Sequence, residues 1–214
     1  MNHNPIPVWP ESPLPPIVCV VGYKDTGKTG VSVRLVRELR RRGYRVGAVK
    51  HGHGFQFDHP RTDSWRLTHE GGADPVLLTG PEGFALLGEW DEGGEPHLED
   101  LVRRHFDDRD VIVAEGFKRD HFPKIEVHRR GHNPKLVYES SGPLADTFLA
   151  LVTDADDLDV PLPTFASHAP ETIASLAELV VVRVIEPPAC ATPCGTQMRN
   201  AAGSPRATTS AKSG

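Results

Sequence analysis

Eight consecutive residues near the start of the chain have the types and spacing of a phosphate-binding loop. The segment 22–29 reads G-Y-K-D-T-G-K-T and matches the pattern G-x-x-x-x-G-K-[S/T] in full. Its glycines allow the backbone torsions that turn successive N–H groups toward one anion. We expect the ammonium of Lys28 to reach the β- and γ-phosphates and the hydroxyl of Thr29 to ligate Mg²⁺. The residues expected to contact the nucleotide are Gly22, Tyr23, Lys24, Asp25, Thr26, Gly27, Lys28 and Thr29.

A carboxylate that holds or orients the metal is expected at the end of another buried strand. The run D-V-I-V-A-E-G at 110–116 begins with Asp110 and ends its apolar stretch at Glu115. Because parallel sheets bind ligands at the carboxyl ends of their strands, Glu115 is the predicted metal ligand and catalytic carboxylate. The alternative is an exposed carboxylate at a strand–loop junction. Lys118 and Arg119 follow, either to contact a phosphate or as solvated loop charges.

A histidine-rich segment, K-H-G-H-G-F-Q-F-D-H at 50–59, leaves a second expected strand at the same edge. His51 and His53, together with Asp58, have side chains that ligate transition metals, but their spacing matches no standard zinc signature. Contact with an anionic ligand and a plain solvated loop are the other interpretations. Asp63 is expected to cap the following helix, to reach the magnesium shell through water in a catalytic role, or both.

The elements that must position these residues follow from the apolar pattern. A buried strand before the phosphate loop and an amphipathic helix after it favour a true phosphate loop over a chance glycine-rich turn. Strands alternate with helices along the chain, which predicts an α/β fold, a mostly parallel sheet sandwiched by helices with an additional β-hairpin. The expected strands are 17–21, 44–49, 76–78, 84–87, 110–114, 124–128 and 148–153, and the expected helices lie at 31–39, 64–69, 98–106 and 172–179.

Composition sets the class of protein. The chain has 214 residues and a net charge of −5 from 24 basic and 29 acidic residues, which argues against coating a nucleic acid by charge alone. No apolar run approaches the about 18 residues that a membrane span needs. Three cysteines form no disulfide framework, so a reducing, cytoplasmic setting is expected. The proline-rich residues 1–16 and the tail 187–214 are expected to be flexible, with the folded domain at 17–186.

Three motifs in this order resemble the molybdopterin-guanine dinucleotide biosynthesis adapter (MobB) family. They are the phosphate loop, the segment from Lys50-His51-x-His53 to Asp58-x-Pro60-x-x-Asp63-Ser64, and Glu115-Gly116-Phe117-Lys118 followed by Lys124-Ile125. The resemblance covers roughly 17–155, and the second and third motifs make it specific because many NTPases share the first. It implies a dimeric P-loop NTPase that binds GTP and assists the guanylyltransferase joining GMP to molybdopterin, itself at most a slow GTPase.

The resemblance also implies which residues form the site, and the sequence departs from the family pattern at some of these positions. It implies that the triphosphate and Mg²⁺ are held by Gly22, Gly27, Lys28 and Thr29, with Glu115 as the acidic residue of the second motif and His51, His53, Asp58 and Asp63 lining the site beside it. Lys24 and Asp25 stand where the family favours small residues, and the Asp25 charge weakens phosphate affinity unless Lys24 neutralises it. Gly30 stands where a second threonine is usual, and Gly54 where a histidine is often found. These departures bear on affinity more than on the fold.

Other functions remain open at this stage. A GTPase that delivers a metal such as nickel would share the phosphate loop and a histidine-rich segment. A passive module would hold molybdopterin or its guanine dinucleotide without hydrolysis. A small-molecule kinase would carry an arginine-rich lid, for which Arg103-Arg104 and Arg129-Arg130 are too scattered. Asp154, after the last expected strand, is either a partner for guanine or an ordinary turn aspartate. No arginine finger is evident, so hydrolysis is expected to be slow.

Overall fold

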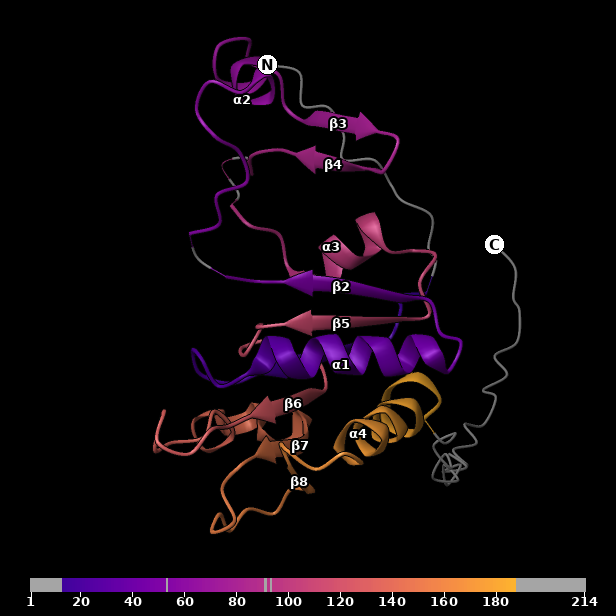
Figure 1. Cartoon of the computed structure of the whole chain (residues 1–214), viewed down its shortest axis with the longest axis vertical. Coiled ribbons are helices and arrows are strands. Elements are labelled where there is room, and N and C mark those ends of the chain that lie inside the picture. The colour runs from indigo at the N-terminus through magenta and orange to yellow at the C-terminus, as the bar shows by residue number, and fades with distance from the viewer. Residues whose placement is uncertain (1–12, 53, 91, 93, 188–214) are drawn as a thin grey trace, which may run out of the picture.

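The computed structural model describes residues 13–52, 54–90, 92 and 94–187, and its centre is a six-stranded parallel sheet. The strands lie in the order β2-β5-β1-β6-β7-β8, so the strand before the phosphate loop is flanked on both sides by strands from later in the chain (Figure 1). Their bounds are β1 Ile17–Val21, β2 Val46–Lys50, β5 Val111–Glu115, β6 Lys124–Val127, β7 Phe148–Thr153 and β8 Thr164–Ala166.

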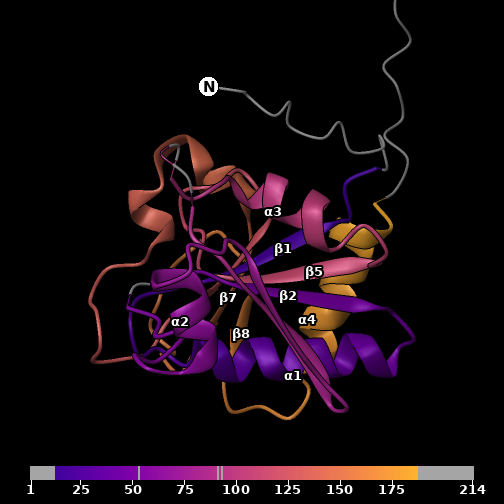
Figure 2. The ribbon, with the colours of Figure 1, turned by 90° about the horizontal axis from the view of Figure 1, so that it is seen from above.

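Helices cover both faces of this sheet, as the apolar pattern predicts. Alternate residues of β1 point to opposite faces, so Val18 and Val20 pack toward α1 (Lys28–Arg41) and α4 (Thr172–Val180). Cys19, in contrast, packs toward α3 (Leu98–His105) and the β6–β7 connection. Figure 2 shows α1 and α3 on opposite sides of the sheet. The core therefore has two layers, and β1 is buried along its whole length.

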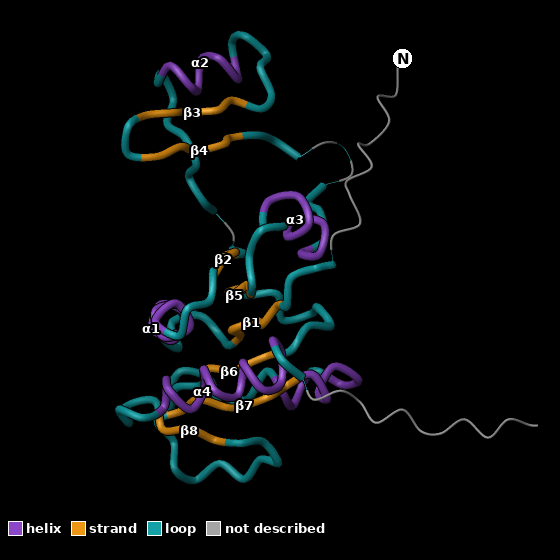
Figure 3. Tube along the Cα trace, turned by 90° about the vertical axis from the view of Figure 1, so that its right-hand side faces the viewer, coloured by secondary structure: helices purple, strands orange, loops and turns teal. Residues whose placement is uncertain are grey.

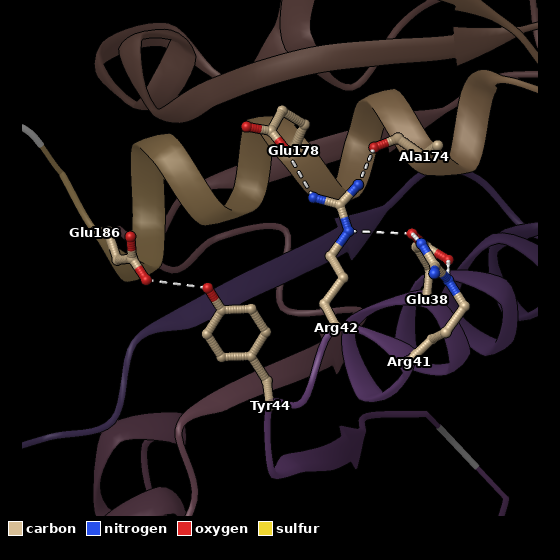
Figure 4. A network of polar contacts seen from close by, with 7 residues as sticks. All are labelled: Glu38, Arg41, Arg42, Tyr44, Ala174, Glu178 and Glu186. Carbon is tan, nitrogen blue, oxygen red and sulfur yellow. Dashed lines mark hydrogen bonds and ion pairs between the residues drawn. The ribbon is translucent and has the colours of Figure 1, made fainter.

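A polar network ties the end of α1 to α4 (Figure 4). The guanidinium of Arg42 donates to Glu178 at 2.7 Å, to the carbonyl of Ala174 at 2.9 Å and to Glu38 at 3.0 Å. Arg42 is the C-cap of α1, so its bonds to Glu178 and Ala174 join the end of this helix to α4. The hydroxyl of Tyr44 donates to Glu186 at 3.0 Å just beyond.

A small arm is set apart from the main sheet. Strands β3 (Val76–Gly80) and β4 (Gly83–Leu87) pair antiparallel as the predicted hairpin, and α2 (Asp63–His69) lies beside them. Figures 1 and 3 show this arm beyond the edge strand β2. Several of its large apolar side chains are exposed, with Phe84 reaching 79%. An isolated two-stranded sheet with such side chains is marginally stable by itself in water.

The apolar pattern places most elements within two residues of their observed bounds and misses a few. It omits β8, a three-residue strand, and the 3₁₀ turns η1 (Tyr138–Ser140) and η2 (Gly142–Thr147) in the β6–β7 connection. The last helix continues beyond its predicted end as a π-helical turn, η3 (Val181–Ile185). No helix of the described part of the chain is long and apolar enough to cross a membrane.

The structure describes residues 13–16 of the expected flexible N-terminus, and Leu14 and Pro16 among them have defined contacts. Leu14 packs against the core on the α3 side, and the carbonyl of Pro16 accepts a hydrogen bond of 2.8 Å from the backbone of Ile112. These contacts attach Leu14 and Pro16 to the folded domain. The remaining residues of that terminus, 1–12, and all of the expected tail except Pro187 lie outside the described residues.

Candidate functional site

The three motifs meet at the carboxyl ends of adjacent strands. The phosphate loop follows β1, Glu115 ends β5 and Lys50 ends β2. In the pairing register Glu115 stands opposite Val20 of β1 on one side and opposite Lys50 of β2 on the other. Because all these strands are parallel, their carboxyl ends lie at one edge, where open α/β sheets bind ligands. Glu115 thus lies at the carboxyl end of β5, and its role in binding stays a prediction.

The phosphate loop has the backbone conformation that its glycines permit. Gly22 has φ +148°, and a Cβ built there would lie 2.3 Å from the carbonyl oxygen of Val127. Gly27 adopts φ +92° at the N-cap of α1, whose amino end therefore faces the loop. The buried Thr26 donates its hydroxyl to the carbonyl of Tyr23 at 3.0 Å. The Thr26–Tyr23 hydrogen bond thus stabilises the loop internally, and the carbonyl of Val127 in β6 lies close against Gly22.

Thr29, Lys50 and Glu115 form a compact polar cluster beside the loop. The hydroxyl of Thr29 donates to Glu115 Oε1 at 2.9 Å, and Lys50 Nζ donates to the same oxygen at 2.7 Å. Lys50 Nζ also lies 3.4 Å from Thr29 Oγ1. Glu115 is 9% exposed, so its carboxylate is largely withdrawn from water. A carboxylate and a hydroxyl at this separation are hard oxygen donors of the kind that Mg²⁺ prefers, so the two predicted metal ligands fit that ion.

Two lysines beside the phosphate loop, Lys28 and Lys118, have lowered pKa values. Lys28 Nζ donates to the carbonyl of Tyr23 at 2.5 Å, and Lys118 Nζ lies 4.5 Å from the centre of the Tyr23 ring. Burial first, and then the nearby charge of Lys118, lower the pKa of Lys28 below its usual value. The pKa of Lys118 is lowered chiefly by burial. A polyanion bound here would relieve this unfavourable concentration of positive charge.

The loop after β5 is fixed by contacts that the sequence alone does not reveal. Gly116 has φ +105°, and a Cβ there would lie 3.2 Å from both Cβ and the carbonyl oxygen of His51. The ammonium of buried Lys124 donates to the carbonyls of Asp120 and Phe122 and to the hydroxyl of Thr147. Burial lowers the pKa of Lys124. Lys124 is therefore a positioning residue that closes the loop carrying Lys118.

The histidine-rich segment is only partly brought to this edge. His51 continues β2 beside β5, its backbone N–H donating to the carbonyl of Glu115 at 2.9 Å, and its ring lies 5.3 Å from that of Phe117. Its Nε2 is 3.2 Å from the carboxylate of Glu95. His53 lies outside the described residues. Across the described ranges, no three His, Cys, Asp or Glu side chains gather as a set of metal ligands.

The structure groups Asp58 and Asp63 with the arm rather than with Thr29 and Glu115. Asp58 Oδ1 accepts from the hydroxyl of Thr62 and the N–H of His59, both at 2.7 Å. The expectation that Asp63 is the N-cap of α2 is wrong, because Thr62 has the extended backbone of a cap and accepts from the N–H of Trp65 at 3.2 Å. Asp63 instead lies in the first helical turn, where its charge favours the helix dipole.

Asp154 follows β7 at the same edge of the sheet. Its Oδ1 accepts from the backbone N–H of Arg130 at 2.7 Å, and this bond lowers the pKa of its carboxyl. The preceding Thr153 is hydrogen-bonded to the buried ring of His128 at 2.9 Å. These bonds make Asp154 part of a hydrogen-bonded turn.

Comparison with known families and proteins identifies relatives of this chain. The model of the family described as MobB, Molybdopterin guanine dinucleotide synthesis protein B, matches residues 17–154. A molybdopterin-guanine dinucleotide biosynthesis adapter protein of Haemophilus influenzae is 36% identical over 118 residues, 54% of this chain and 64% of the relative. The protein of that name in Escherichia coli is 32% identical over 124 residues, 56% of this chain and 70% of the relative. The chain thus matches about two thirds of each relative's length.

Solved structures share the same architecture. A crystal structure of molybdopterin-guanine biosynthesis protein B aligns with a TM-score of 0.58 and 25% identity, covering 77% of this chain and 97% of the other. A MobB protein homologue from Bacillus stearothermophilus aligns with a TM-score of 0.56 and 23% identity, covering 78% and 99%. The predicted fold class, a P-loop NTPase with a mostly parallel sheet and an added hairpin, is confirmed.

Proposed function

Because this chain belongs to the MobB family, we propose that it is a GTP-binding adapter in molybdenum cofactor biosynthesis. In this proposal it assists, in the cytoplasm, the guanylyltransferase that attaches GMP to molybdopterin to form molybdopterin guanine dinucleotide. The observation that carries the proposal is the meeting of a complete phosphate loop with the Thr29–Glu115 pair at one edge of the sheet. Nucleotide binding is the activity that such an edge supports.

Each part of the site has a defined task in the proposal. The N–H groups of the loop and the amino end of α1 bind the phosphates, and Lys28 and Lys118 bring positive charge to them. Thr29 and Glu115 hold Mg²⁺, which when bound neutralises charge on the β- and γ-phosphates. His51 lines the mouth of the site. Lys28 leaves its present acceptor, the Tyr23 carbonyl, when a phosphate oxygen becomes available.

The protein acts on the cofactor pathway mainly as an adapter and hydrolyses GTP slowly. Efficient hydrolysis needs a cation that stabilises the transition state and a group that orients the attacking water. The sequence shows no evident arginine finger, and the Glu115 carboxylate bonds to Thr29 and Lys50. Gln56 lies exposed in the β2–α2 connection rather than packed against the site. We expect turnover well below about 1 s⁻¹, under the usual range for enzymes.

The arm supports a homodimer. Leu77, Phe84 and Leu86 are each more than half exposed on a two-stranded sheet that stands away from the main sheet. A contiguous apolar surface of this kind marks a protein–protein contact. A second copy is the occupant we propose, because two short sheets pairing or stacking would complete a layer that one copy leaves open.

Reconstitution tests the proposed function. The guanylyltransferase is incubated with molybdopterin and limiting GTP, with and without this protein, and the dinucleotide cofactor formed is measured. We expect a higher yield with the wild-type chain and a smaller increase with Glu115→Gln. Glu99→Gln, an exposed carboxylate on α3, is the matched control and is expected to behave as the wild type. An unchanged yield at limiting GTP would contradict the adapter function.

A further inference from the structure

Lys50 places a positive charge on the two side chains that fit Mg²⁺. Its Nζ lies 2.7 Å from Glu115 Oε1 and 3.4 Å from Thr29 Oγ1, and these two oxygens are 2.9 Å apart. The ammonium therefore contacts both members of the hard-oxygen pair at once. Glu115 is largely buried, so the charge of Lys50 compensates a carboxylate that water reaches poorly.

The other lysines of the site do not share this position. Lys28 donates to the carbonyl of Tyr23, and Lys118 lies over the Tyr23 ring. Neither has a recorded bond to Glu115 or Thr29 in the described part of the structure. Lys50 is thus distinguished from its neighbours by contact, and not only by charge.

The backbone of Lys50 is fixed while its side chain is free to turn. As the last residue of β2 it stands directly opposite Glu115 in the parallel pairing of β2 with β5. Its side chain is 51% exposed, so the ammonium has space to leave the carboxylate for solvent. A cation tethered at this distance remains at high effective concentration beside Glu115 whether or not it is in contact.

We propose that Lys50 is an internal counter-ion that competes with Mg²⁺ for the Thr29–Glu115 pair. This inference rests on the proposed function only in taking Mg²⁺ as the metal that accompanies the nucleotide. A divalent ion on Glu115 and an ammonium on the same oxygen repel each other strongly at this separation. Metal binding therefore displaces Lys50, and the work of displacement weakens metal affinity. Without metal, Lys50 keeps Glu115 neutralised next to the phosphate site, so nucleotide binding depends less on Mg²⁺.

The test measures metal affinity directly, with Mn²⁺ as a paramagnetic probe. Free Mn²⁺ is followed by electron paramagnetic resonance during titration of the full-length chain, with and without a non-hydrolysable GTP analogue. The variants are Lys50→Met, which keeps the length of the side chain and removes its charge, and Lys135→Met, which removes the charge of an exposed lysine in the β6–β7 connection. We expect Lys50→Met to lower the Mn²⁺ midpoint by about tenfold, and Lys135→Met to change it by less than about twofold.

A second readout needs no nucleotide. Lys50→Met leaves the Glu115 carboxylate uncompensated, so we expect its Tm to fall below that of the wild type and Mn²⁺ to restore it, with little Mn²⁺ effect on wild-type Tm. An Mn²⁺ midpoint unchanged or raised in Lys50→Met would overturn the proposal, as would equal shifts in both variants. If the wild type bound no GTP analogue, the proposed function would fail, and the nucleotide-free titration would still decide this inference.

Discussion

Replacing Gly22 by alanine is expected to break the phosphate loop by a steric conflict with β6. The added Cβ would lie 2.3 Å from the carbonyl oxygen of Val127 and 2.9 Å from Thr26 Oγ1. The first atom belongs to the backbone of a buried strand, which cannot move without disturbing its neighbours. The positive φ of +148° adds strain of about 1–3 kcal/mol for any side chain. We expect a total loss of about 3–5 kcal/mol of unfolding free energy, at the upper end for single substitutions.

Gly27→Ala is the matched control for this substitution. Gly27 also has a positive φ, +92°, but a Cβ there would meet no atom within 4 Å. Only the strain of the left-handed conformation remains, about 1–2 kcal/mol. Urea unfolding of both variants, followed by circular dichroism, measures the difference if both keep the wild-type slope. Equal stability of the two variants would refute the argument that contact with Val127, rather than backbone conformation, requires glycine at position 22.

Three further outcomes follow from contacts in the structure. Lys28→Ala should weaken GTP binding by at least about tenfold in calorimetry with unchanged circular dichroism, because the site loses its principal counter-charge; wild-type affinity would remove the phosphate-loop assignment. Phe84→Lys on the arm should shift sedimentation from dimer to monomer, whereas Val33→Lys, an exposed apolar residue on α1, should not; a Phe84→Lys variant that remains dimeric would place the contact elsewhere. Hydrogen bonds from Arg41 and Arg42 lower the pKa of Glu38 to about 2, so its stabilising contribution is present above about pH 4.5 and is lost as the pH falls toward 2. Glu38→Gln should therefore flatten the acid limb of a curve of Tm against pH, and an unaltered acid limb would contradict this.

Local patterns in the sequence are sufficient for the phosphate loop and most of the elements around it. The phosphate loop is one continuous segment of eight residues, and its chemistry depends on residues within that segment. The motif can therefore be recognised from residue types and spacing without knowledge of the fold. The continuous apolar run of β1 reflects a strand that is buried on both faces. The four-residue spacing of Val31, Leu35 and Leu39 reflects a helix, α1, that is buried on one face. The strand-end rule for parallel sheets also locates Glu115 at the ligand edge.

Only the tertiary structure decides the order of the strands in the sheet. This order determines which side chains become neighbours at the site. Lys50 and Glu115 are separated by 65 positions and become neighbours because β5 lies between β2 and β1. No sequence spacing indicates that contact. The same holds for Lys118, which approaches Tyr23 because buried Lys124 closes the loop that carries it.

The arm shows a second case, in which sequence proximity does not fix the local contacts. Asp58 belongs to the histidine-rich segment and Asp63 follows it closely, which suggests a shared site with His51. In the structure the chain leaves the sheet edge after β2 and turns into α2, where Asp58 bonds to the helix-capping Thr62. The first backbone N–H groups of a helix have no partner within the helix, so nearby polar side chains form hydrogen bonds there. Such bonds hold a short polar segment next to the helix that it precedes. The sequence determines which residues have the chemistry to bind a phosphate or a metal; the packing of strands and arm determines which of them face one another.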